Sequence, residues 1–265
     1  MTMIEPGWYP DPWYPRGLRY WDGRQWTTYV GRRTRLPHPT LPLAAAVGAL
    51  VALAVPIVSS RFLLRALSDV NWPIAAYVTL AAVVGYGPAM AWCWYAGRRW
   101  GSGGFRRSVG LSAQWSDLGW GPVTWLACLG AQVVVGIVVV ALGIPFASNT
   151  DAVSDLRSDR GYVLSLLVLA VVIAPIVEEI VFRGVVMRGL LSVCHPVLAV
   201  GLQAVLFGTA HFDPIRGIGN IGLVMVLSAV GAVLGGAAYL LRRIAPTMIA
   251  HAILNGLALA LVLSG

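Results

Sequence analysis

The sequence contains no lysine and few charged residues of any kind. Charged side chains make up 11% of the 265 residues, and hydrophobic ones make up 58%. Soluble domains carry about 25% charged residues, so a water-soluble globular enzyme is disfavoured. A disordered chain is excluded by the same apolar excess. Glutamate is especially scarce: it occurs three times, and two of those positions, Glu178 and Glu179, are adjacent within an apolar stretch.

Cysteine is equally sparse. Cys93, Cys128 and Cys194 lie in or beside apolar runs without a CxxC spacing, so we expect them to pack as small hydrophobic side chains. The sequence therefore indicates neither a disulfide framework nor a cysteine metal site. The net charge of +8 comes largely from arginines in short pairs between apolar runs, which is typical of membrane flanks rather than of a nucleic-acid groove. No nucleic-acid partner is expected.

The N-terminal part differs in composition from the rest. Its first 36 residues are polar and aromatic, so no secretory signal peptide is expected. Residues 1–30 hold four of the eleven tryptophans, and residues 18–26 predict a tight β-hairpin that turns at Asp22 and Gly23. Residues 1–30 resemble the short Trp-rich domain of unknown function that precedes membrane segments in many actinobacterial proteins, which implies a location and no reaction. Residues 31–40 predict a basic linker.

Seven apolar segments follow, and each is close to the roughly 17–25 residues that a spanning helix needs. They lie near residues 41–58, 73–97, 121–145, 161–187, 196–212, 219–240 and 245–264. The expected fold is an all-α polytopic membrane protein, a bundle of about seven transmembrane helices preceded by the small hairpin domain. The first two helices carry no charged group in their interiors, so we expect residues 41–119 to be accessory packing elements.

The arginines predict how this bundle is oriented. Ten of them fall in the N-terminal flank and the loops on the same side, and five fall in the alternate loops, which include the acidic stretch 151–160. The positive-inside rule then predicts a cytoplasmic N-terminus and an outer C-terminus. We expect the protein to be a multi-pass protein of the plasma membrane.

One ionisable cluster lies inside an apolar segment, where such groups are costly and mark functional sites by default. Glu179 and Arg183 are four residues apart with the acid first, which favours an ion pair on one helix face. Glu178 lies about 100° around the helix, so it is expected to remain free of that pair. A carboxylate in an apolar environment suits a general base. The alternative is a polar cluster that only stabilises the helix.

Two further pairs of residues show the same spacing of four. Phe207 precedes His211 at the end of one apolar segment, and His251 precedes Asn255 in the last one. His251 and Asn255 share a helix face and could donate hydrogen bonds to a developing oxyanion. Interhelical hydrogen bonding explains that pair equally well. A single buried cluster would let all these groups satisfy one another, and it could activate a water to hydrolyse an amide or ester.

The three motifs also carry a resemblance to a known family. They are Glu178-Glu179-x-x-x-Arg183, Phe207-x-x-x-His211 and His251-x-x-x-Asn255. In identity, spacing and order they resemble the motifs of the CPBP intramembrane peptidases, the family of CAAX proteases, Abi proteins and bacteriocin-processing enzymes. The resemblance covers residues 120–265 and implies that this part is the peptidase core. It implies an endopeptidase that cuts a membrane-associated peptide or protein, near its C-terminus or within it.

The resemblance also implies roles for the individual residues. Glu178 and His211 would activate the attacking water, and His251 and Asn255 would bind the oxyanion. Glu179, Arg183 and Phe207 would support the site. The family has been described both as metalloproteases and as glutamate peptidases. The motif HExxH is absent, and no spacing requires a cofactor. Glu178, His211 and His251 could bind zinc, but a metal-independent attack is favoured.

Two other functions and one conflict stay open. A non-catalytic scaffold or bacteriocin-immunity protein could keep the same fold, and a transporter could use intramembrane acids as a proton relay, although no internal repeat is evident. On the predicted boundaries, Glu178 lies towards the cytoplasmic end of its helix and His211 at the outer end of the next. They would meet only if that next helix is short, tilted or placed deeper. His195, beside Pro196, is assigned no role.

Overall fold

The computed structural model describes most of the chain, in two compact units formed by residues 1–38 and 39–265. The described residues are 5–13, 17–32, 40–67, 69–101, 103–148, 158–214 and 216–264. Most of the predicted basic linker (residues 33–39) and most of the acidic stretch (residues 151–157) lie outside the described residues. Each unit is treated by itself.

The small unit is a three-stranded antiparallel sheet of β1 (Gly7–Pro10), β2 (Gly17–Trp21) and β3 (Trp26–Arg32). The predicted hairpin is confirmed, since β2 pairs with β3 and the turn follows Trp21. The turn is wider than predicted, because four residues separate the two strands. The strand β1 was not anticipated, because two aromatic residues between Gly7 and Pro10 give no alternating pattern.

Asp22 stabilises this turn. Its Oδ1 accepts hydrogen bonds from the backbone N–H groups of Gln25, at 2.8 Å, and Arg24, at 2.7 Å. These bonds favour the ionised carboxylate and hold the pKa of Asp22 below its usual value. The rings of Trp21 and Trp26 then meet edge to face across the strand ends, with their centroids 5.2 Å apart.

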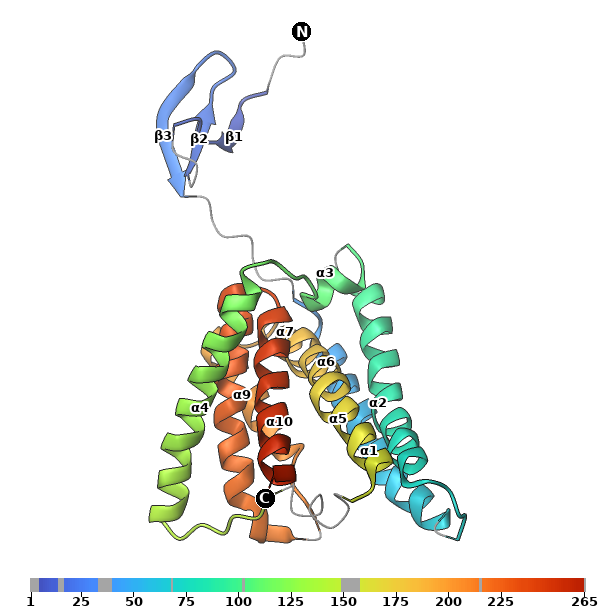
Figure 1. Ribbon diagram of the computed structural model, residues 1–265. Helices are drawn as coiled ribbons and strands as arrows, with labels where there is room; N and C mark the ends of the chain where they lie inside the picture. Colours follow the sequence, from blue (N-terminus) through green and yellow to red (C-terminus); the bar gives the residue numbers. More distant parts are fainter. Residues whose placement is uncertain are drawn as a thin grey trace. The chain divides into compact units, whose positions relative to one another are not determined.

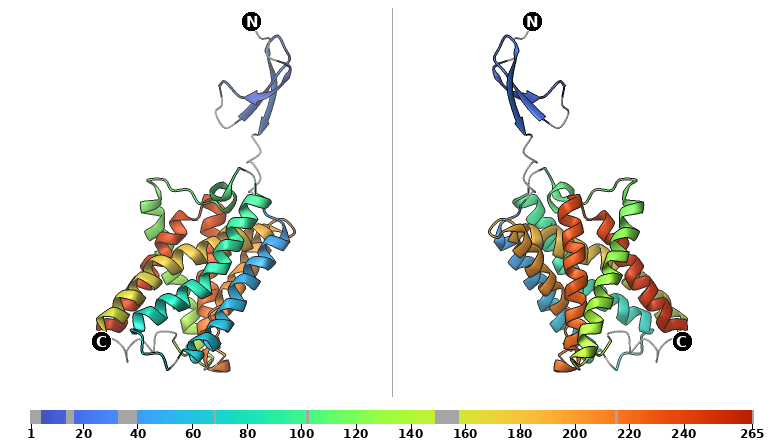
Figure 2. Two further views of the ribbon diagram at one scale, coloured as in Figure 1. Left: turned by 90° about the vertical axis from the view of Figure 1, so that its right-hand side faces the viewer. Right: turned by 90° about the vertical axis from the view of Figure 1, so that its left-hand side faces the viewer.

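The second unit is entirely helical in its described part (Figure 1). Its helices are α1 (Leu43–Ala66), α2 (Ile74–Arg99), α3 (Phe105–Val109), α4 (Asp117–Ala141), α5 (Arg160–Leu167), α6 (Ala174–Glu178), α7 (Met187–Leu190), α8 (Pro196–Thr209), α9 (Ile221–Leu241) and α10 (Ala245–Ser264). Two π-helical segments, η2 (Val168–Ile173) and η3 (Glu179–Val186), join α5, α6 and α7 into one continuous helix, and a short 3₁₀ turn, η4 (Gly217–Asn220), precedes α9. The long helices run side by side in both perpendicular views (Figure 2).

Five of these helical stretches are long and apolar enough to cross a membrane. They are Ile74–Arg99, Asp117–Ala141, Arg160–Leu190, Gly217–Leu241 and Ala245–Ser264. The other two of the seven predicted segments correspond to α1, which is apolar over Leu43–Pro56, and to the shorter apolar helix α8, Pro196–Thr209. Many large apolar side chains of α4 point away from the protein, including Val133, Val134 and Ile137 at 53–63% exposure. Such a surface suits lipid and not water, so the protein is a polytopic helical membrane protein, as predicted.

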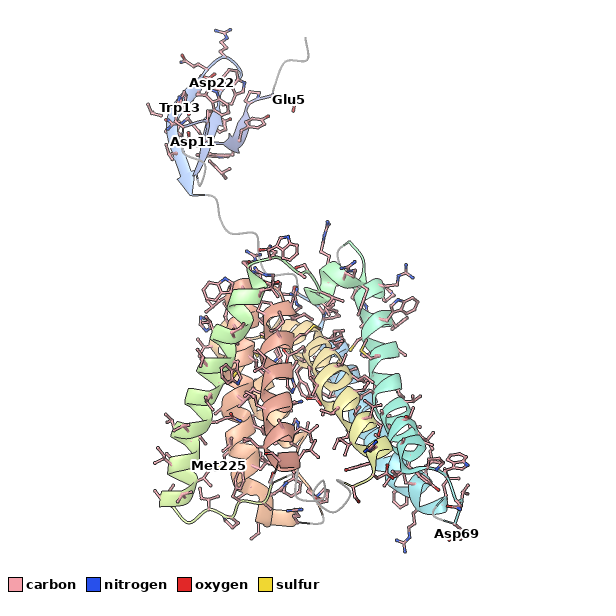
Figure 3. All side chains as sticks on the ribbon, in the orientation of Figure 1. Glu5, Asp11, Trp13, Asp22, Asp69 and Met225 are labelled. Carbon is pink, nitrogen blue, oxygen red and sulfur yellow. The ribbon has the colours of Figure 1, made fainter. Side chains whose placement is uncertain are left out.

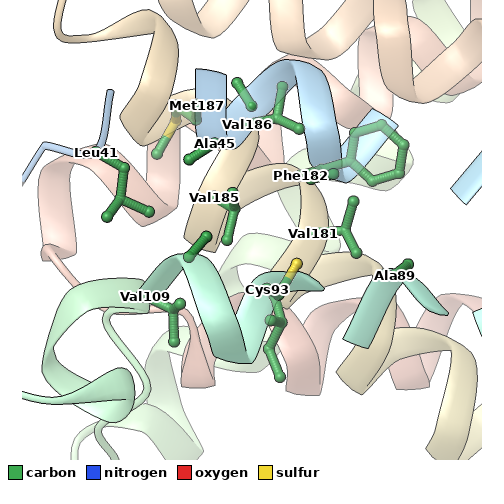
Figure 4. Close-up of a cluster of buried hydrophobic side chains, with 14 of the residues drawn as sticks. Leu41, Ala45, Ala89, Cys93, Val109, Val181, Phe182, Val185, Val186 and Met187 are labelled. Atoms are coloured by element: carbon green, nitrogen blue, oxygen red, sulfur yellow. The ribbon is translucent and has the colours of Figure 1, made fainter. Parts of the chain in front are cut away.

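The largest buried cluster joins α1, α2, α3 and the η3 segment (Figure 4). Ala45, Ala89 and Cys93 bring the first two helices close to Val181 and Val185, and all five are fully buried. Small side chains permit this close approach between membrane helices. Trp92 fixes the same contact, since its indole N–H donates to the Ala45 carbonyl at 2.9 Å. Cys93 packs as the predicted small hydrophobic residue and is a free cysteine.

The contact between α8 and α9 requires a glycine at position 208 but not at position 201. Alanine substitutions at these two positions should therefore change the stability differently. A Cβ atom on Gly208 would come within 2.5 Å of the Val224 carbonyl oxygen and 2.8 Å of the Ser228 nitrogen. The same atom on Gly201, in the same helix, would meet open space. Gly208→Ala should therefore destabilise the protein by about 1–3 kcal/mol, the usual cost of overpacking.

The matched control is Gly201→Ala, which should be neutral or slightly stabilising because alanine favours a helix over glycine. Thermal unfolding of the purified variants in detergent measures both effects. Equal midpoints for the two variants would contradict the tight α8–α9 contact.

Candidate functional site

The candidate site begins in the long helix of residues 160–190, whose hydrogen-bond pattern is irregular. Pro175 lacks a backbone N–H, so the helix cannot keep a regular ladder at this point. The structure places π-helical turns on both sides of Pro175, in η2 and η3. Such turns rotate the side chains that follow, and they are frequent at functional sites. Glu178 ends α6 and Glu179 opens η3, so the two acids stand at the junction.

Glu179 and Arg183 form the ion pair that their spacing predicts. Arg183 Nη1 lies 2.9 Å from Glu179 Oε1, and both side chains are fully buried. The guanidinium also donates to the Gly231 carbonyl of α9 at 3.3 Å and lies 4.3 Å from the centroid of the Phe207 ring. His251 of α10 contacts the same carboxylate, with Nδ1 3.1 Å from Oε1. Residues of four helical segments therefore meet around one buried charge pair.

Glu178 is separate from this pair, as the helix geometry predicts, but it is not free. The Tyr86 hydroxyl, on α2, donates a hydrogen bond to Glu178 Oε1 at 2.7 Å. Glu178 Oε2 faces His211 Nε2 and His251 Nε2, each at 3.9 Å. These two distances exceed that of a direct hydrogen bond. The expectation of an unattached Glu178 is thus corrected: one oxygen is held and the other faces two imidazoles.

Tyr86 is the functional neighbour that the sequence analysis missed. It lies on α2, which was expected to be a packing element because its interior has no charge. A signal was present, because a tyrosine hydroxyl inside an apolar helix normally finds a hydrogen-bond partner. The sequence alone could not name that partner, since Tyr86 and Glu178 are 92 residues apart.

The position of His211 resolves the conflict of depth left by the sequence. The helix α8 has only 14 residues and is therefore about 21 Å long, shorter than the roughly 30 Å of a bilayer core. It ends at Thr209, so His211 stands at the depth of Glu178. His211 Nδ1 lies 2.9 Å from the Phe207 carbonyl oxygen. A carbonyl only accepts, so Nδ1 carries a proton, and Nε2 is the ring nitrogen that faces Glu178.

His251 and Asn255 both line the same cavity, as their spacing predicts. Asn255 Nδ2 donates to the Ala170 carbonyl in η2 at 2.8 Å, so one of its two N–H groups serves the interhelical bond that was the alternative explanation. The second N–H group remains for other contacts. His195 does not line this cavity. Its Nδ1 accepts a hydrogen bond from the Val197 N–H at 3.4 Å, so the side chain caps the start of α8.

A cavity of about 460 Å³ joins these side chains. Six residues of the three motifs and of α2 line it, namely Tyr86, Glu178, Phe207, His211, His251 and Asn255, and Leu166, Leu169, Leu223 and Leu254 line other parts. These six residues come from four helices or their ends. Such a cavity can bind an apolar segment beside a carboxylate and two imidazoles, the groups that general acid–base chemistry needs.

The residues do not form a recognisable metal site. Glu178, His211 and His251 carry oxygen and nitrogen donors that zinc accepts. Within the described ranges, however, no group of three His, Cys, Asp or Glu residues is arranged to hold a metal ion. One imidazole nitrogen of His251 is also directed at Glu179. No step is therefore assigned to a metal.

Comparison with known protein families gives two matches. Residues 160–257 match the model described as type II CAAX prenyl endopeptidase Rce1-like, and residues 6–39 match DUF2510, a protein of unknown function. No curated protein and no solved structure gives a significant match. The first match contains Glu178, His211, His251 and Asn255. Residues 160–257 are therefore similar to the Rce1-like CAAX endopeptidases, a family of membrane-embedded proteases, and residues 6–39 are similar to DUF2510.

Proposed function

We propose that the cavity hydrolyses a peptide bond of a membrane-associated peptide or protein, near its C-terminus or within it, by activating a water. One observation carries the proposal: Glu178 Oε2 faces the Nε2 atoms of His211 and His251 at 3.9 Å each inside the cavity. A water placed between Glu178 Oε2 and either nitrogen would lie within hydrogen-bond reach of both atoms. The substrate's reacting carbonyl would approach it from the apolar side of the cavity.

In this proposal Glu178 and His211 prepare the nucleophile. Glu178 Oε2 takes a proton from the water as the oxygen attacks the carbonyl carbon, and the same proton later passes to the leaving amine. The Nε2 lone pair of His211 accepts the water's second hydrogen and fixes its direction. The Phe207 carbonyl keeps His211 in the required tautomer, since it holds the proton on Nδ1.

His251 and Asn255 would bind the oxyanion of the tetrahedral intermediate. The carboxylate of Glu179 accepts from His251 Nδ1, so it stabilises a protonated ring whose Nε2–H then donates to the oxyanion. Asn255 would add its second N–H, the one not used by Ala170. Glu179, Arg183 and Phe207 have supporting roles here: they hold His251 and pack beneath the rings.

Tyr86 would act as a positioning residue for the base. Its hydrogen bond occupies Glu178 Oε1 and so directs Oε2 towards the imidazoles.

The distribution of arginines between the loops supports a cytoplasmic N-terminus. We propose that the protein is a multi-pass protein of the plasma membrane with this orientation.

The catalytic assignment predicts that Glu178→Gln and His211→Ala lower kcat/KM by about 10²–10⁴-fold, the usual contribution of general acid–base groups. Purified protein in liposomes, assayed with a panel of membrane-proximal and lipidated peptides, measures this effect. Asp213→Asn is the control, because this loop carboxylate pairs with Arg216 outside the cavity. Cleavage by both variants at the parent's rate would refute the assignment, and a cellular phenotype that survives Glu178→Gln would favour the scaffold or immunity function.

The positioning role predicts that Tyr86→Phe lowers kcat by about 10- to 100-fold, since a hydrogen bond to a charged group is worth about 1.5–3 kcal/mol. KM and the unfolding midpoint should change little, because the ring and its packing remain. Tyr77→Phe on the same helix is the control: it removes a hydroxyl that donates to the Leu67 carbonyl. A change in KM alone, with kcat preserved, would assign Tyr86 to substrate binding instead.

A third prediction concerns metal. If water activation rests on Glu178 and His211 alone, extensive treatment with a zinc chelator should leave the rate of peptide cleavage unchanged. Loss of activity on chelation, with recovery on adding zinc, would replace the metal-independent mechanism by a metal-dependent one.

A further inference from the structure

A second polar pocket lies away from the cavity, where α3 and the end of α9 come together. It has a volume of about 520 Å³ and is lined by Arg106, Arg107, Gly110, Leu111, Ser112, Ala113 and Arg242. Three of these seven residues are arginines, and none is an acid. The buried Arg188 of α7 lies directly behind Gly110. We call Arg106, Arg107, Arg188 and Arg242 the arginine pocket.

A glycine allows Arg188 to lie against this pocket. Gly110 adopts φ +72°, and a Cβ atom at this position would collide with the Arg188 guanidinium. Glycine at 110 therefore permits the close approach of a charge that is only 4% exposed. Arg242 lines the same pocket as Gly110, so two arginines from different helices lie at one place. An anion bound there would offset the repulsion between their like charges.

Arg242 itself is strained. It has φ 62° and ψ 18°, and it is the single non-glycine residue with positive φ in the described part of the chain. The end of a helix commonly takes this conformation, but glycine usually provides it. Holding a non-glycine residue in this region has a conformational cost that glycine would avoid. Here the side chain is the arginine that lines the pocket.

The surroundings indicate where in the membrane the pocket lies. The end of α2, the helix α3 and the start of α4 occupy one end of the bundle (Figure 1). Exposed tryptophans gather on these segments, namely Trp94, Trp100, Trp115 and Trp120, and Arg98 stacks on Trp94 at 4.9 Å. Asp69 lies at the opposite end (Figure 3). Tryptophan and arginine together mark the level of the lipid headgroups.

We propose that the arginine pocket binds the phosphate of an anionic phospholipid headgroup, such as phosphatidylglycerol. Guanidinium groups recognise phosphate with several charge-assisted hydrogen bonds, and basic pockets between transmembrane helices are a known form of lipid site. The pocket shares no lining residue with the cavity of Glu178. The proposal is thus independent of the peptidase chemistry.

Thermal unfolding of the full chain in a neutral detergent tests this proposal. Phosphatidylglycerol should raise the midpoint in a saturable way, and phosphatidylcholine should not. Glycerol 1-phosphate at the same concentration should have no effect. An equal response to glycerol 1-phosphate would assign the pocket to a small soluble anion, and no response to phosphatidylglycerol would overturn the proposal.

Variants separate binding from folding. Arg242→Gly should raise the midpoint of the lipid-free protein, because glycine relieves the strained backbone, and should weaken the response to phosphatidylglycerol at least tenfold. Arg107→Gln should weaken the response to phosphatidylglycerol without raising the midpoint of the lipid-free protein. Arg216→Gln, which changes an arginine paired with Asp213 in the loop before α9, should leave it unchanged. If Arg242→Gly keeps the full lipid response, the pocket is not the binding site.

Discussion

The buried pair of Glu179 and Arg183 is the contact around which the helical unit is organised. Both side chains are fully buried, and two charges in an apolar interior are costly unless their hydrogen bonds are satisfied. Arg183 therefore needs the Gly231 carbonyl, and Glu179 needs His251. Because these partners lie on α9 and α10, the requirement to satisfy one ion pair fixes how three helices pack. Phe207 adds α8 through its contact with the guanidinium.

The same constraint divides the work between two neighbouring acids. Adjacent residues on a helix point about 100° apart, so Glu179 faces the inner pair and Glu178 faces the cavity. The two residues are both glutamates, but their side chains contact different groups. Glu178 is bound by a neutral hydroxyl and faces two imidazoles across 3.9 Å. The short helix α8 completes this arrangement, because a helix of full length would carry His211 beyond the acid.

Sequence reasoning recovered what depends on spacing within one helix. The pair of Glu179 and Arg183, the shared cavity wall of His251 and Asn255 and the hairpin between Trp21 and Trp26 all follow from local geometry. It did not recover contacts between distant segments. The hydrogen bond from Asn255 to the Ala170 carbonyl depends on the π-helical segment η2, which the residue pattern does not predict. The end of α8 at Thr209 was not predicted either, since no residue in the apolar segment 196–212 marks the end of the helix.

Tyr86 shows why the boundary of the site cannot be drawn from motifs alone. The family match covers residues 160–257, and Tyr86 lies outside it on α2, a helix that shares the largest buried cluster with α1 and η3. Its hydroxyl nonetheless contacts the carboxylate that we propose as the base. Packing of α2 against η3 therefore sets the direction of Glu178 Oε2. Any change that moves α2 by one hydrogen-bond length would release the Glu178 carboxylate from Tyr86, so α2 belongs to the site and not only to its support.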